Sequence, residues 1–95
     1  MSDVIESAVK ALNEKISGGF DGVAKFVIGD EGSIIIDSNG ARAADDDAEV
    51  TLTADADVFQ SILEGETNPT AAFMTGQLKI EGDMGQAMKL GSVLS

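Results

Sequence analysis

The segment from residue 57 to residue 90 constrains the fold most, because turn-forming residues interrupt its apolar pattern at short intervals. Gly65 and Gly76 are typical of residues that follow the end of a helix, and Asn68-Pro69 is typical of a helix start. Only short elements fit between these breaks. In order they predict a helix capped by Asp55 and closed by Gly65, a helix over 69–74, a strand over 77–81, and a last helix that starts at Gly82-Asp83.

The first half of the chain shows two hydrophobic periods. Residues 3–17 carry apolar side chains at helical spacing, with Asp3 as a candidate N-cap and Gly18-Gly19 as the stop. From residue 20 to residue 53 the period becomes two, which is typical of strands. Four strands are predicted there, the first three as an antiparallel meander with Asn39-Gly40 in a hairpin turn: 22–28, 33–37, 41–44 and 48–53.

The length of 95 residues predicts one domain over residues 1–95. Hydrophobic residues make up 43%, which is enough for one packed core. No apolar run approaches the length of a membrane span, and no secretory leader opens the sequence. We therefore expect a cytoplasmic protein.

The charge balance limits the partners. Seventeen acidic residues against six basic ones give a formal net charge of −11. Nucleic-acid binders need a basic stripe to displace counterions, so no nucleic-acid partner is expected. Stable docking on anionic lipid headgroups is disfavoured by the same repulsion. Solubility explains the acidity, and a basic partner is the alternative that stays open.

The composition leaves few catalytic groups, because the chain has no histidine, cysteine, tyrosine or tryptophan. There is no G-x-S-x-G elbow and no glycine-rich phosphate loop. The segment Asp37-Ser38-Asn39-Gly40 does not fit a calcium loop, since its glycine stands at the fourth position instead of the sixth. We expect no enzyme activity, no metal site and no cofactor.

The apolar faces of residues 57–90 are rich in phenylalanine and methionine, namely Phe59, Phe73, Met74, Met84 and Met88. Methionine is flexible and suits a cavity that accepts ligands of varied shape. In an arbitrary domain such residues are more often ordinary core, and periodicity alone does not distinguish a core from a cavity.

The second half of the sequence resembles a known protein family. The segments AEVTLTADADVF, LEGETNP and AAFMTGQLKIEGDMGQAMKL resemble the sterol carrier protein type 2 (SCP2) domain family. The last segment follows the family pattern A-F-x-x-G-K-L-K-I-x-G-D/N-M-x-x-A-x-K-L, with Gln77 in place of a lysine. The resemblance is specific over residues 65–90 and extends only to the layout of elements over residues 1–47.

The resemblance implies an α/β (α+β) fold with a mixed five-stranded sheet of order 3-2-1-4-5, covered on one face by helices. It also implies an apolar tunnel between sheet and helices that holds fatty acid, fatty acyl-CoA, phospholipid or sterol-like molecules. The pattern places Phe73, Met74, Met84 and Met88 at this tunnel. The predicted inward faces of the other elements add four lipid-binding candidates: Phe59, Leu63, Leu78 and Ile80. Gly76, Gly82 and Pro69 match the pattern as residues of backbone geometry.

The leading hypothesis is non-enzymatic binding and transfer of a lipid or other long hydrophobic small molecule. The alternative is a module that docks a protein partner or a second copy, or that presents a hydrophobic substrate to a partner enzyme. A transient membrane partner, the natural ligand and the oligomeric state stay open. An anionic fatty acid would need Lys79, Lys89 or Arg42 at the tunnel mouth.

Overall fold

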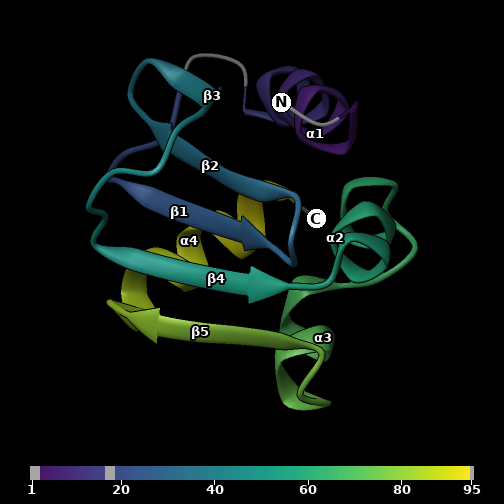
Figure 1. Ribbon diagram of the computed structural model, residues 1–95. Coiled ribbons are helices and arrows are strands. Elements are labelled where there is room, and N and C mark those ends of the chain that lie inside the picture. The colour runs from purple at the N-terminus through teal and green to yellow at the C-terminus, as the bar shows by residue number, and fades with distance from the viewer. Residues whose placement is uncertain (1–2, 17–18, 95) are drawn as a thin grey trace.

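The computed structural model describes residues 3–16 and 19–94, and in these ranges it contains four helices and five strands (Figure 1). The elements in chain order are α1 (Asp3–Lys15), β1 (Ala24–Ile28), β2 (Gly32–Asp37), β3 (Gly40–Ala43), β4 (Val50–Ala54), α2 (Ala56–Leu63), α3 (Pro69–Met74), β5 (Leu78–Gly82) and α4 (Met84–Leu94). Within the described ranges, none of the helices combines the length and apolar character needed to cross a membrane.

The five strands form one mixed sheet in the order β3-β2-β1-β4-β5. β1 and β4 run parallel, whereas the other three neighbouring pairs run antiparallel. The buried side chains of all four helices join those of the strands in one hydrophobic cluster, so the helices cover one face of the sheet. The predicted fold class and strand order are confirmed.

Every predicted element is present, with small differences at the ends. β1 begins at Ala24 instead of residue 22, and β4 begins at Val50 instead of residue 48. Just before both strands, the Val23 N–H donates to the Glu49 side-chain Oε1 at 3.0 Å instead of to a backbone carbonyl, so the regular strand pairing begins after these residues. The predicted helix end at residue 17 and the predicted stop at Gly18 lie outside the described residues.

Strict alternation in the two central strands builds the core. The inward side chains of β1 and β4 are buried, whereas those between them are half-buried on the other face. Phe26 of β1 packs against Phe59 of α2, with ring centroids 4.7 Å apart and an interplanar angle of 57°. Tilted ring pairs of this kind add to the stabilisation that burial provides. This contact fixes α2 against the middle of the sheet.

β2 departs from alternation because Ile34, Ile35 and Ile36 are all buried. Ile35 points to the face opposite the helices, where the strand register sets Lys25 on one side of it and Arg42 on the other. The connection over residues 44–49 crosses this face, since Lys25 Nζ binds Asp45 Oδ1 at 2.9 Å. The outer face is therefore partly covered, which explains how Ile35 is only 1% exposed.

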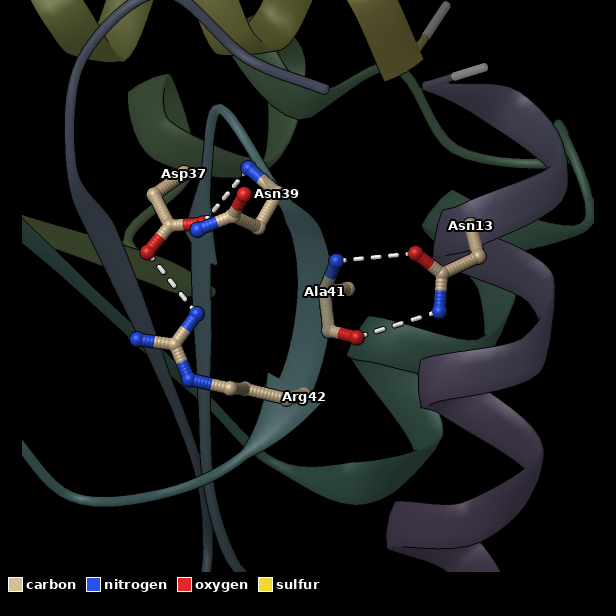
Figure 2. A network of polar contacts seen from close by, with 5 residues as sticks. All are labelled: Asn13, Asp37, Asn39, Ala41 and Arg42. Atoms are coloured by element: carbon tan, nitrogen blue, oxygen red, sulfur yellow. Dashed lines mark hydrogen bonds and ion pairs between the residues drawn. The ribbon is translucent and has the colours of Figure 1, made fainter. Parts of the chain in front are cut away.

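Asn13 attaches α1 to the edge of the sheet. Its Nδ2 donates to the Ala41 carbonyl at 3.0 Å, and its Oδ1 accepts the Ala41 N–H at 2.8 Å (Figure 2). β3 is an edge strand, so these two backbone groups have no neighbouring strand on that side. One amide side chain thus satisfies both a donor and an acceptor of the edge strand.

Replacing Asn13 with alanine should destabilise the fold through this edge. We expect Asn13→Ala to lower the free energy of unfolding by roughly 1–3 kcal/mol, because two hydrogen bonds of about 1 kcal/mol each are lost. Urea unfolding followed by circular dichroism measures the change. Lys10→Ala, an exposed position of the same helix, is the control and should change stability little. Equal effects of the two substitutions would contradict a structural role for the Asn13 amide.

Asp37 is the centre of a second set of polar contacts, at the β2–β3 hairpin (Figure 2). Its Oδ2 accepts from Arg42 Nη1 at 2.8 Å, and its Oδ1 accepts the Asn39 N–H at 2.9 Å. The Arg42 hydrogen bond and then the Asn39 N–H hold the pKa of Asp37 below its ordinary value of 3.8. A carboxyl group with a lowered folded-state pKa stabilises the fold above its unfolded-state pKa, and that contribution is lost as pH falls.

The Arg42→Gln variant should therefore have a pH-dependent effect. Its stability loss relative to wild type should be greatest above pH 3.8 and should shrink as the pH falls below that value. Carboxyl-carbon NMR titration should show the pKa of Asp37 moving upward in the variant. An unchanged Asp37 titration would show that Arg42 does not stabilise the ionised carboxylate.

Candidate functional site

An apolar groove lies between α3, β5 and α4, with a cavity volume of about 200 Å³. We call it the α3–α4 groove. Among the described residues that line it, Thr70 alone has a polar side chain, and none is titratable. The full lining is Leu52, Pro69, Thr70, Phe73, Met74, Leu78, Ile80, Met84, Ala87, Met88 and Gly91. Such a surface can enclose an apolar molecule.

The start and end of α3 place one wall of this groove. The Asn68 side chain caps the helix by accepting the Thr70 N–H at 2.8 Å, and Pro69 takes the first helical position. After the helix, Gly76 adopts a φ of 81°, which directs the chain into β5. Phe73 and Met74 are thereby set beside β5.

The junction between β5 and α4 places the other wall. Gly82 has a φ of 105°, and a Cβ atom there would collide with the Glu49 carbonyl oxygen. Asp83 then caps α4, because its Oδ1 accepts the Gly85 N–H at 2.8 Å and the Gln86 N–H at 3.3 Å. The prediction that Gly82 serves backbone geometry is confirmed.

Six of the eight predicted lipid-binding residues lie together in the α3–α4 groove. Leu78 is buried and Ile80 is half-buried, so these two β5 residues form part of its floor. The four residues that the family pattern placed at the tunnel are exposed to different degrees: Phe73 39%, Met84 44%, Met88 60% and Met74 79%. They form an exposed apolar rim.

The apolar side of α4 serves both the groove and the core. Met84, Ala87, Met88 and Gly91 share one face of the helix, and all four line the groove. The buried residues of α4 are Ala87, Leu90 and Leu94, so the core side lies next to the groove side and Ala87 belongs to both. Leucine at the two positions toward the C-terminus supplies the buried area that holds the helix in this orientation.

Phe59 and Leu63 lie apart from the other six. Both line a second cleft of about 350 Å³ between α1 and α2, which we call the α1–α2 cleft. Phe59 is 1% exposed and belongs to the hydrophobic core, whereas Leu63 is half-buried. Local sequence could not separate the two clefts, because the packing of α2 against α1 joins residues distant in the chain.

The three cations considered for a tunnel mouth do not line the α3–α4 groove. Arg42 lies on β3 at the opposite edge of the sheet and pairs with Asp37. Lys89 Nζ pairs with Asp21 Oδ2 at 3.2 Å, and Lys79 lines a separate cleft together with Thr53. Residues 3–16 and 19–94 also contain no group of three acidic, histidine or cysteine side chains able to hold a metal ion.

The sequence reasoning missed five groove residues: Leu52, Pro69, Thr70, Ala87 and Gly91. Two of them carried a usable signal, since Leu52 alternates inward on β4 and Ala87 follows Met84 by three helical positions. Gly91 brings α4 close to α3, because a Cβ atom there would lie 3.9 Å from Cβ of Pro69. That approach depends on helix packing, which the sequence does not display.

Comparison with known proteins gives a consistent family match. Residues 4–95 match the family described as the SCP-2 sterol transfer family. Hydroxysteroid dehydrogenase-like protein 2 of Xenopus laevis is 30% identical over 102 residues, covering 99% of this chain and 24% of that protein. Human sterol carrier protein 2 is 33% identical over 97 residues, covering 90% of this chain and 18% of that protein. The chain thus spans less than a quarter of the length of these relatives.

Solved structures share the fold. Sterol carrier protein 2 of Aedes aegypti, in complex with the C16 fatty acid palmitate, has a TM-score of 0.79 at 20% identity, covering 100% of this chain and 97% of that one. The apo form from Yarrowia lipolytica has a TM-score of 0.68 at 26% identity, covering 97% and 81%. The ubiquinone synthesis protein UbiJ-SCP2 has a TM-score of 0.66 at 19% identity, covering 99% and 93%.

The rim and the floor of the α3–α4 groove should respond differently to substitution. Met74→Gln and Met88→Gln should each change the free energy of unfolding by no more than about 0.5 kcal/mol, because both side chains are largely exposed. Leu78→Ala should cost roughly 2–5 kcal/mol, because it leaves a cavity in the core. Urea unfolding of the three variants provides the comparison. A loss above about 2 kcal/mol for either methionine would show that the rim is part of the core.

Proposed function

Because the chain belongs to the SCP-2 sterol transfer family, we propose that it binds a lipid or other long hydrophobic molecule in the α3–α4 groove and transfers it without chemical conversion. The observation that carries this proposal is the groove itself, whose lining is apolar except for Thr70. The exposed rim supports it too, since Met74 and Met88 hold large apolar side chains in solvent at the edge of the groove.

The energetics of apolar burial are sufficient for such binding. Each buried methylene contributes roughly 0.8 kcal/mol, so a sixteen-carbon chain offers about 12 kcal/mol before costs. Immobilisation and imperfect fit remove several kcal/mol of this free energy. The remaining affinity lies in the micromolar-to-nanomolar range. Since this attraction is non-directional, selectivity among acyl chains should be weak.

The groove must widen to accept a complete chain, because its volume of about 200 Å³ is below the roughly 300–1,000 Å³ of typical ligand pockets. Met84 and Met88 are suited to this, since a methionine side chain has three rotatable bonds. A long chain that passed Leu78 would reach the core to which Phe59 belongs, and Leu63 borders the cleft beyond. We propose contact with Phe59 and Leu63 only for such long ligands.

The charge around the site favours lipids with a neutral or solvent-exposed headgroup. No basic residue lines the groove, and the chain carries a net charge of −11. Lys89, the nearest in sequence to the rim, is already paired with Asp21. We propose that a phospholipid or neutral lipid is preferred to a free fatty acid, whose carboxylate would gain no partner.

The absence of titratable groups in the lining supports a non-enzymatic role for this chain. We further propose that residues 1–95 act as one cytoplasmic domain. A second candidate function is docking, in which the same exposed rim presents a bound hydrophobic substrate to a partner enzyme. The greater length of the curated relatives favours it, because in them the matching region accompanies a much longer chain.

Native mass spectrometry of the protein purified from its expression host tests the leading function. We expect adducts near one lipid per chain, identified by organic extraction and lipid analysis. An apo mass, together with no displacement of a fluorescent acyl probe, would exclude lipid binding and leave the docking function.

Two tryptophan variants on α4 test the position of the ligand. Met88→Trp should fill the groove and weaken binding of a fluorescent acyl probe by at least tenfold, since only part of the chain could still be buried. Val93→Trp is the matched control, because Val93 is 40% exposed on the same helix and does not line the groove. Equal affinity of the two folded variants would disprove the groove as the binding position.

A further inference from the structure

The α1–α2 cleft is separate from the α3–α4 groove, and no residue lines both. Its volume of about 350 Å³ falls within the roughly 300–1,000 Å³ of typical small-molecule sites. Its lining is Asp3, Val4, Ser7, Ala8, Ala11, Ala56, Phe59, Gln60, Leu63 and Glu64. Figure 1 shows the two helices side by side beyond the β1–β2 turn.

The floor of the cleft is apolar and made largely of small side chains. Ala8 and Ala11 of α1 and Ala56 of α2 line it, together with Phe59 and Leu63 of α2. Alanines on two packed helices leave the space that larger side chains would fill. The Phe59 ring is held against Phe26, so the floor has a fixed position. These features fit a short apolar chain.

The charged side chains of the described residues that line the cleft are both negative. Asp3 and Glu64 contribute carboxylates, and residues 3–16 and 19–94 supply neither a lysine nor an arginine to the lining. Gln60 Nε2 donates to Glu64 Oε1 at 3.4 Å, so these two polar side chains lie together. Ser7 adds a hydroxyl group. An anionic headgroup would meet two like charges here, whereas a cationic one would meet two opposite charges.

We propose that the α1–α2 cleft is a second binding site, which takes an amphiphile with a short apolar chain and a cationic, amine-type headgroup. The chain lies on the alanine and Phe59 floor, and the headgroup lies between Asp3 and Glu64. Apolar burial supplies most of the affinity, and the carboxylates select the sign of the headgroup charge. This site does not depend on the function proposed for the α3–α4 groove.

Binding of decyltrimethylammonium and of decanoate, each below its micelle concentration, tests the site by isothermal titration calorimetry. We expect the cation to bind more tightly by roughly two- to thirtyfold, the range that two partly screened ion pairs supply. Amide NMR shifts should be largest at the residues of the α1–α2 cleft. Equal affinities, or shifts centred on another surface, would overturn the proposal.

A charge-matched pair of variants separates the cleft from the general attraction of an acidic protein for cations. Asp3→Asn combined with Glu64→Gln should abolish the preference for decyltrimethylammonium over decanoate. Asp46→Asn combined with Asp47→Asn removes the same charge from the exposed 44–49 connection and should leave the preference intact. Equal losses in the two double variants would show non-specific attraction and overturn the proposal.

A filling variant and its control locate this site. Ala11→Leu should weaken decyltrimethylammonium binding at the α1–α2 cleft at least tenfold by occupying the cleft, as followed by the amide shifts of the cleft residues. Val93→Trp, which lines neither the cleft nor the α3–α4 groove, should leave these shifts and the affinity unchanged. An unchanged affinity in folded Ala11→Leu would place the amphiphile elsewhere and overturn the second site, whatever the outcome of the lipid-binding tests on the groove. The charge variants decide the matter if Ala11→Leu does not fold.

Discussion

The parallel pairing of β1 with β4 is the constraint from which the rest of the architecture follows. β3 and β4 run in the same direction and are separated by β2 and β1, so the chain must cross these two strands to begin β4, and it does so through residues 44–49. Glu49, at the end of this connection, is hydrogen-bonded to Val23 through both its N–H and its side chain, which holds the start of β4 beside β1. β4 covers one edge of β1, and β5 pairs with the other edge of β4. The chain between β4 and β5 forms α2 and α3.

The α3–α4 groove forms where β5 joins the edge of the sheet. β5 is a short edge strand, with α3 before its start and α4 after its end (Figure 1), and the two helices approach each other where Gly91 lies beside Pro69. Glu49 contributes again, because its carbonyl oxygen accepts the Asp83 N–H at 2.9 Å and occupies the space where a side chain at Gly82 would stand. The crossover that completes the sheet therefore also sets the angle at which α4 leaves it. Fold and groove share one set of backbone contacts.

The local elements were readable from the sequence, whereas the relations between them were only partly so. Gly65 and Asn68-Pro69 marked real helix ends because caps are local chemistry. The strand order came from the family resemblance and was confirmed. The burial of Ile35 was not predictable, since it depends on a connection that crosses the outer face. The sequence also could not predict that Phe59 and Met88 lie at different sites. An apolar side chain gives the same sequence signal whether it lies in a core, in a cleft or at an exposed rim.

The paired hydrogen bonds of Asn13 have a consequence for the behaviour of the protein at high concentration. An edge strand with free N–H and C=O groups is a template onto which the strand of another molecule can add, and this is a common start of aggregation. At Ala41 both groups are already engaged by Asn13, so an incoming strand would first have to displace α1. One asparagine thus protects a short edge strand from intermolecular sheet growth.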